Sequence, residues 1–127
     1  MQILVTGGAG YIGSMLVRQL LSNGHQVRVV DLLHSGGESI IDLLDSDDFE
    51  FTRADVRKEE AMRDAVEGMN AVVHLAAIVG DPACAAAPEV AKSVNRDASK
   101  QLYEIANQKG VGQFVFASTC SNYGKME

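Results

Sequence analysis

The sequence predicts an α/β fold, a doubly wound parallel sheet with helices on both of its faces. Apolar segments of strand length alternate along the chain with amphipathic segments of helix length, which is the pattern of successive βαβ units. Residues 71–77 form a nearly continuous apolar run, typical of a parallel strand that is covered on both faces. A glycine-rich turn joins the first apolar run to the first helix. These observations predict a single domain with strand order 3-2-1-4-5.

The first 31 residues carry the strongest motif. An apolar strand at residues 3–5 enters the glycine-rich turn, and a helix runs from Tyr11 until Asn23-Gly24 ends it. Helical spacing predicts that one face of this helix carries Ile12, Met15, Leu16, Gln19 and Leu20. A second strand, residues 26–30, ends at Asp31.

The turn has the residue types of a phosphate-binding loop. Gly7 lets the chain turn, Gly10 removes a Cβ that would keep a pyrophosphate away from the backbone, and Gly13 lets helix and strand pack closely. The free amide groups at the start of the helix then face the anion. This context of strand, turn, helix and strand predicts a dinucleotide site.

The position of Asp31 predicts which dinucleotide is bound. It lies eighteen residues beyond Gly13, a distance at which a carboxylate can accept both hydroxyls of an adenosine ribose. The same charge repels a 2′-phosphate, and the next residues, Leu32, Leu33 and His34, offer no arginine to hold one. The sequence therefore favours NAD over NADP.

The later segments complete the alternation. In chain order, the sequence predicts a short helix at residues 40–44, a strand at 49–56, a helix at 57–67, a strand at 71–77, a long helix at 89–108 and a fifth strand at 113–117.

Three motifs carry a resemblance to a known family. They are Val5-Thr6-Gly7-Gly8-Ala9-Gly10-Tyr11-Ile12-Gly13, His74-Leu75-Ala76-Ala77 and Ser118-Thr119-Cys120-Ser121-Asn122-Tyr123-Gly124. These residues and their spacing resemble the motifs of the extended short-chain dehydrogenase/reductase family, and within it those of the NAD-dependent epimerases and dehydratases that act on nucleotide sugars. The resemblance implies a Rossmann-type fold that binds NAD, and a nucleotide-sugar substrate that passes a hydride transiently to NAD.

The same resemblance implies roles for single residues. Backbone amides of the first helix would hold the pyrophosphate, the end of the second strand the ribose, and the end of the third strand the adenine. Thr119 would be catalytic, because its hydroxyl would hydrogen-bond the substrate oxygen that loses or gains a proton. No metal is implied. The implied cofactor-binding residues are Gly7, Gly10, Tyr11, Ile12, Gly13, Asp31, Leu32, Leu33, Asp55, Val56, Leu75, Ala76, Ala77, Asn95 and Ser118.

Several of these residues have structural interpretations that stay open at this point. Asp55 can equally be the N-cap of the following helix. His74 is interpreted as a structural histidine and is given no catalytic role. Asn95 can be an exposed helix residue, and strand-end hydroxyls such as that of Thr119 often form turns.

The catalytic Tyr-x-x-x-Lys pair that the resemblance implies is missing from the 127 residues, because Tyr11, Tyr103 and Tyr123 have no lysine four positions later. We therefore expect residues 1–127 to be an incomplete NAD-binding domain, truncated before a sixth strand and a substrate domain. The alternative is a complete NAD-binding module that senses or regulates without redox chemistry. Family members commonly pair through long helices, so the resemblance also implies a possible homodimer through residues 89–108.

Composition excludes other classes of function. A net charge of −6 with scattered acidic residues argues against nucleic-acid and anionic-membrane partners. No apolar run approaches the roughly twenty residues that span a bilayer, and the N-terminus lacks the features of a signal peptide, so a cytoplasmic protein is expected. Cys84 and Cys120 match neither a disulfide framework nor a metal site and are expected to be free thiols.

Overall fold

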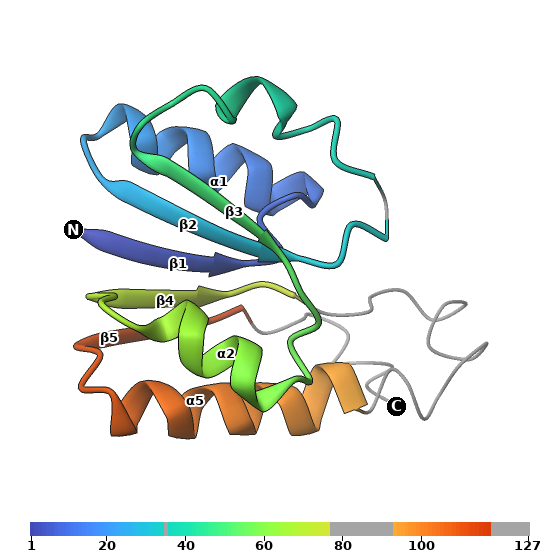
Figure 1. The fold of residues 1–127 in the computed structure, drawn as a ribbon, viewed down its shortest axis with the longest axis vertical. Helices are drawn as coiled ribbons and strands as arrows, with labels where there is room; N and C mark the ends of the chain where they lie inside the picture. Colours follow the sequence, from blue (N-terminus) through green and yellow to red (C-terminus); the bar gives the residue numbers. More distant parts are fainter. Residues whose placement is uncertain (35, 77–92, 118–127) are drawn as a thin grey trace, which may run out of the picture.

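A five-stranded parallel sheet forms the centre of the computed structural model, which describes residues 1–34, 36–76 and 93–117 (Figure 1). The strand order is β3-β2-β1-β4-β5, and each adjacent pair is parallel, which confirms the predicted fold class and topology. The strands are β1 (Gln2–Thr6), β2 (Gln26–Asp31), β3 (Phe49–Arg53), β4 (Ala71–His74) and β5 (Gln113–Phe116).

β5 is one residue shorter than the sequence predicted, and β3 and β4 are each three residues shorter. Hydrogen bonds explain the ends of β3 and β4. β3 ends at Arg53 because Asp55 and the residues after it form a turn, in which the amide of Arg57 donates to the Asp55 carboxylate. β4 ends at His74 because the amide of Ala76 donates to the side-chain hydroxyl of Thr6, and not to a main-chain carbonyl of β1. The chain therefore leaves the ladder at the edge where the predicted ligand would lie.

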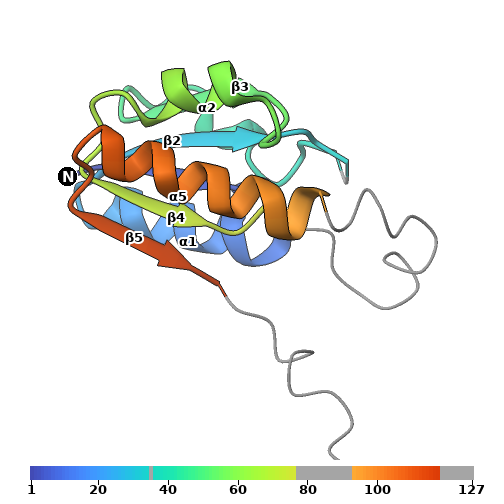
Figure 2. The ribbon, with the colours of Figure 1, turned by 90° about the horizontal axis from the view of Figure 1, so that it is seen from below.

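Helices cover both faces of the sheet, as expected for a doubly wound fold (Figure 2). They are α1 (Tyr11–Ser22), the short 3-10 helix η1 (Ile41–Leu43), α2 (Glu59–Val66), the π-helical turn η2 (Ser93–Asp97) and α5 (Ala98–Gln108). The predicted helix at residues 89–108 is thus present from Ser93 onwards, and its first four residues lie outside the described ranges. Gly24 and Gly110 follow α1 and α5 with positive φ angles of 85° and 76°, so glycine ends both helices.

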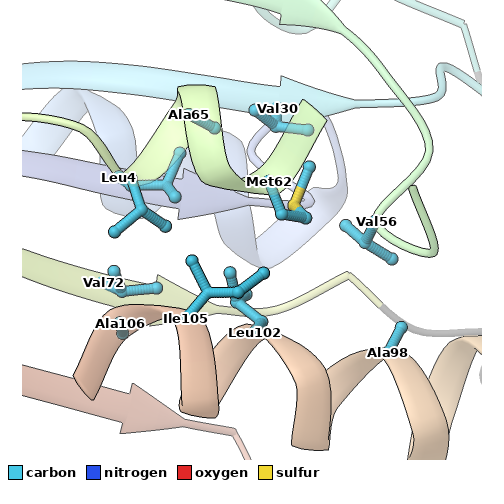
Figure 3. Packing of buried hydrophobic residues seen from close by; sticks show 11 residues of the cluster. Leu4, Val30, Val56, Met62, Ala65, Val72, Ala98, Leu102, Ile105 and Ala106 are labelled. Atoms are coloured by element: carbon cyan, nitrogen blue, oxygen red, sulfur yellow. The ribbon is translucent and has the colours of Figure 1, made fainter. Parts of the chain in front are cut away.

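Alternate residues of each strand belong to two separate cores. Leu4, Val30 and Val72 pack with buried residues of α2 and α5, and Figure 3 shows these side chains meeting between the two helices and the sheet. The neighbouring residues Ile3 and Val5 pack in the other core, together with Val17 of α1 and Val27 and Val29 of β2. The two-residue period of a strand therefore divides the apolar side chains between the faces.

The predicted apolar face of α1 is only partly confirmed: Leu16 and Leu20 are half-buried, and Leu20 packs against the core below the helix. Ile12 and Met15 are 69% and 59% exposed, whereas Gly13, Ser14 and Val17 are buried. The reason is the packing of Gly13 against the glycine-rich turn, which fixes the rotation of the helix. Val17, one turn later, then faces the sheet, and Ile12 and Met15 point away from it.

We expect Leu102→Ala to lower the free energy of unfolding by about 2–5 kcal/mol, because Leu102 is fully buried in the core between α5 and the sheet. Urea unfolding followed by circular dichroism measures the change. The matched control is Met15→Ala, at a mostly exposed position of α1, which should stay within about 0.5 kcal/mol of the wild type. Equal losses in both variants would contradict the assignment of the core.

Candidate cofactor-binding site

The carboxyl ends of β1, β2, β3 and β4 meet at one edge of the sheet, and hydrogen bonds continue the ladder just beyond them. The amide of Gly7 donates to the carbonyl of Val30 at 2.8 Å, and the amide of Leu75 donates to the carbonyl of Thr6 at 3.0 Å. Most predicted site residues lie at these strand ends, in the loops that follow them or at the start of α1: Gly7, Gly10, Tyr11, Ile12, Gly13, Asp31, Leu32, Leu33, Asp55, Val56, Leu75 and Ala76. Three others, Ala77, Ser118 and Thr119, lie outside the described residues.

The glycine-rich turn is sterically tight at three glycines, of which Gly8 would place a Cβ 2.6 Å from Cγ2 of the buried Val29. Gly7 has a φ of 77°, and a Cβ there would lie 2.8 Å from the backbone nitrogen of Ala76. A Cβ on Gly13 would overlap the carbonyl oxygen of Gly7 and lie 2.8 Å from the Cα of Gly8. Gly10 differs, because a Cβ there would meet only the Gly7 carbonyl oxygen, at 3.3 Å. Glycine at positions 7 and 13 is therefore needed for the turn to pack against its own backbone and that of Ala76. Glycine at position 10 instead leaves space beside the start of the helix.

The first turn of α1 adds hydrogen-bond donors to this space. The helix starts at Tyr11, and the amide of Ser14 donates to the carbonyl of Gly10 at 2.9 Å. Helix geometry leaves the amides of the first turn, which include those of Tyr11 and Ile12, without intrahelical acceptors. The Tyr11 and Ile12 side chains are largely exposed and do not cover the helix end. Such an end favours an anionic group.

The carboxylate of Asp31 accepts hydrogen bonds from the glycine-rich turn and from the loop that follows β2. Its Oδ2 accepts the amide of Ala9 in the glycine-rich turn at 3.0 Å, and its Oδ1 accepts the amide of Leu33 at 2.7 Å. Leu33 has a φ of 64°, a conformation that L-residues rarely adopt, so the second bond holds a strained residue in place. A carboxylate has about four lone-pair positions, and these two bonds leave room for further donors.

Asp55 is paired with Arg57. The guanidinium of Arg57 donates from Nε to Oδ1 at 3.0 Å and from Nη2 to Oδ2 at 2.6 Å, and this side-chain hydrogen bonding lowers the pKa of Asp55. The alternative interpretation of Asp55 as a helix N-cap was wrong, because α2 starts at Glu59 after Lys58, and no side chain of the described residues caps it. The neighbouring Val56 is buried in the core with α2 and α5.

His74 is buried and hydrogen-bonded at both ring nitrogens, which agrees with a structural histidine. Its Nδ1 is 2.6 Å from Oγ1 of Thr6, and its Nε2 is 2.8 Å from Oγ of Ser99. Ser99 also donates to the backbone carbonyl of Asn95 at 3.0 Å. Asn95 is therefore connected to the end of β4 through these side chains. Burial lowers the pKa of His74 to about 4.

The sequence reasoning missed four residues that support or border this edge. Thr6 and Ser99 contact His74, Ser39 donates to the carbonyl of Ala9 at 2.6 Å, and Arg53 donates through Nε to the carbonyl of Leu32 at 3.3 Å. The position of Thr6 at a strand end, directly before the glycines, is a signal that could have identified it. The other three are brought to the edge by elements distant in sequence, and Arg53 places a cation beside a segment that has no arginine of its own.

Two further properties concern the described residues as a whole. Within residues 1–34, 36–76 and 93–117, no three side chains of His, Cys, Asp or Glu gather in a way that could hold a metal ion. None of the helices described in these ranges has the length and apolar character needed to cross a membrane.

We expect Gly13→Ala to abolish dinucleotide binding and to destabilise the fold, because its Cβ would overlap backbone atoms of the turn. Gly10→Ala should leave the free energy of unfolding within about 1 kcal/mol of the wild type, since the one atom close to its Cβ is the Gly7 carbonyl oxygen, at 3.3 Å. Thermal unfolding and calorimetric titration with NAD measure the two effects. A Gly13→Ala chain as stable as Gly10→Ala would show that the turn is not as tightly packed as described.

His74 also predicts how stability depends on pH. Between the ordinary pKa of 6.5 and the lowered value of about 4, the unfolded chain binds a proton that the folded chain does not, so stability falls as the pH falls. From pH 7 to pH 4.5 this contribution is about 2.5 kcal/mol. Urea unfolding of wild type and His74→Asn at both pH values should show a flatter dependence in the variant. The control is His34→Asn, at an exposed position. Parallel pH dependences of wild type and His74→Asn would contradict the prediction.

Comparisons with known proteins agree with this geometry. Residues 3–127 match the model of the NAD dependent epimerase/dehydratase family. A dTDP-glucose 4,6-dehydratase of Streptomyces niveus is 36% identical over 99% of this chain and 40% of its own length. A UDP-glucose 4-epimerase of Klebsiella pneumoniae is 33% identical over 98% of this chain and 93% of its own sequence.

A solved structure shows the same architecture. The dTDP-glucose 4,6-dehydratase of Streptomyces venezuelae, crystallised with NAD bound, has a TM-score of 0.89 and 33% identity over the whole of this chain and 42% of its own. The chain thus spans about two fifths of the length of both dehydratases, and it corresponds to their N-terminal part. Because the family model covers nearly every residue, the chain belongs to the NAD-dependent epimerase/dehydratase family of extended short-chain dehydrogenases/reductases.

Proposed function

We propose that this chain binds NAD at the carboxyl edge of its sheet, and that it is the cofactor-binding part of an enzyme that epimerises or dehydrates a nucleotide sugar. One observation carries the proposal. The Asp31 carboxylate braces the glycine-rich turn through Ala9 and the strained Leu33, and it retains lone pairs at the edge. A carboxylate so placed, bonded to the loop that leads into α1, matches the ribose and the pyrophosphate of a dinucleotide.

Each part of the site has a task in binding. Amides of Tyr11 and Ile12 donate to the pyrophosphate, and Gly10 keeps the approach free of a Cβ. Asp31 accepts the ribose hydroxyls, with Leu32 and Leu33 beside it. The end of β3, with Asp55 and Val56, borders the adenine, and the end of β4, with Leu75 to Ala77, faces the adenosine ribose. Asn95 and Ser118 complete the contacts to the cofactor.

NAD is the better fit of the two dinucleotides. A 2′-phosphate would lie against the Asp31 carboxylate, whose oxygens already face the ribose position. Arg53 is the one described cation that hydrogen-bonds this segment, through the Leu32 carbonyl, and it partly offsets that repulsion. Asp31 ends β2 and Arg53 ends β3, and the two residues are partners in the parallel register.

The reaction requires a further part of the protein. The chemistry that bound NAD would supply at this site is reversible hydride transfer with a carbon of the sugar. In this chain Thr119 orients the substrate oxygen through a hydrogen bond while that oxygen exchanges its proton. The partner in proton exchange is a tyrosine assisted by a lysine, in a Tyr-x-x-x-Lys arrangement that the 127 residues do not contain. Residues 1–127 are accordingly proposed to be an incomplete NAD-binding domain.

The cofactor assignment predicts a defined change in selectivity. Calorimetric titration should show that NAD binds more tightly than NADP, and that Asp31→Ala weakens NAD roughly 10- to 150-fold through the loss of a charge-assisted bond. The variant should also narrow the ratio between the two affinities, because the repulsion of the 2′-phosphate is removed. Loosening of the loops alone would weaken both dinucleotides equally.

The control for this experiment is Asp64→Asn, at an exposed carboxylate of α2, which should bind NAD like the wild type. Absence of NAD binding by the folded wild-type chain would contradict the cofactor assignment, and the same titration on a form extended beyond Glu127 would show whether a later segment completes the site. A coding frame that continues to a Tyr-x-x-x-Lys pair supports the enzyme. A stop codon after Glu127 favours an NAD-binding module without redox chemistry.

A further inference from the structure

The buried side chains of Thr6, His74 and Ser99 form a hydrogen-bond chain whose direction is determined by its donors. Oγ1 of Thr6 accepts the amides of Leu75 at 3.1 Å and Ala76 at 3.2 Å, so its own proton is directed to Nδ1 of His74. The proton of the neutral ring is then on Nε2, which donates to Oγ of Ser99. Ser99 donates in turn to the backbone carbonyl of Asn95. The hydrogen bonds at Nδ1 and at Nε2 thus require the same tautomer of His74.

This hydrogen-bond network connects three segments that border the proposed NAD site. Thr6 is the last residue of β1 and directly precedes Gly7. The amide of Ala76, which donates to Thr6, is the atom that a Cβ on Gly7 would approach most closely. At the other end, Ser99 lies in the first turn of α5 and holds the π-helical turn that contains Asn95. One imidazole therefore bridges the strand ends and the helix start.

We propose that His74, as the neutral Nε2–H tautomer, is a positioning residue of the cofactor site that sets the spacing of Gly7 and Ala76 and the placement of Asn95. The inference rests on the proposed function, since these three residues are proposed to contact NAD. An apolar side chain could fill the same volume, but it could not accept from Thr6 and donate to Ser99. Within the described ranges no buried side-chain nitrogen or oxygen lacks a hydrogen bond, so the network is fully satisfied as it stands.

Two substitutions separate the halves of the network. In His74→Asn the amide oxygen can replace Nδ1 as the acceptor for Thr6, and in His74→Gln the amide nitrogen can replace Nε2 as the donor to Ser99. Thr6→Val and Ser99→Ala remove the two hydroxyls directly. We expect each variant to weaken NAD roughly three- to tenfold per lost bond, and Thr6→Val to have the largest effect because its hydroxyl makes three bonds.

The matched control is Val72→Ala, on the same strand and fully buried in the core with α2 and α5. It lowers stability without touching the network, and should bind NAD within about twofold of the wild type at a temperature where every variant is folded. If Val72→Ala weakens NAD as much as the His74 variants do, the effect is one of general stability, and the positioning role is overturned. Equal NAD affinity in wild type and all network variants overturns it as well.

Nitrogen NMR of the imidazole gives a readout that does not depend on NAD. We expect the chemical shifts of a neutral ring protonated at Nε2, and a change in these shifts in Thr6→Val and Ser99→Ala. A ring protonated at Nδ1 overturns the assigned network, whatever the chain binds. Failure of the wild type to bind NAD, with the expected tautomer present, would instead overturn the proposed function and, with it, the role in cofactor binding.

Discussion

The close contact between the backbone of Gly7 and the backbone of Leu75 and Ala76 is the constraint on which the rest of the site depends. A Cβ at Gly7 would lie within 2.9 Å of three backbone atoms there. Only glycine satisfies this approach together with a φ of 77°. The turn can therefore lie directly over the neighbouring strand end, and α1 starts where its first amides are open to the edge of the sheet.

Three side chains from different elements hold this turn in place. Asp31, at the end of β2, accepts the amide of Ala9, and Ser39 donates to the Ala9 carbonyl. Thr6 accepts the amides of Leu75 and Ala76, which follow β4. A ligand that approaches the edge meets a backbone whose hydrogen bonds are largely in place, so less conformational freedom is lost on binding. Leu33 shows the cost of this arrangement, since its strained backbone is held by a hydrogen bond to Asp31.

Membership of the epimerase/dehydratase family and the geometry of the edge support each other. The relatives reported above differ in the reaction for which they are named, dehydration in one case and epimerisation in another, yet they match the same residues of this chain. What they share is the cofactor-binding architecture. This chain covers 40% of the dehydratase's length and 93% of the epimerase's sequence, so its likeness to both does not distinguish the two reactions.

The sequence by itself determined the fold class, the strand order and most of the residues that follow the strand ends, because periodicity and glycine spacing are local signals. It did not determine the rotation of α1, since the contact of Gly13 with the turn outweighs the apolar spacing of Ile12 and Met15. The sequence also did not indicate that Asp55 pairs with Arg57. Asp55 does not cap α2, because this helix begins at Glu59.

Only the tertiary structure decided how the buried polar groups are satisfied. Thr6 and His74 are 68 positions apart, and Ser99 lies 25 positions beyond His74, so no local pattern relates them. The parallel register of β1 with β4 places Thr6 opposite His74, and the packing of α5 on the sheet brings Ser99 to the other ring nitrogen. These contacts depend on the pairing of distant strands, and that pairing is the physical reason they could not be predicted from the sequence.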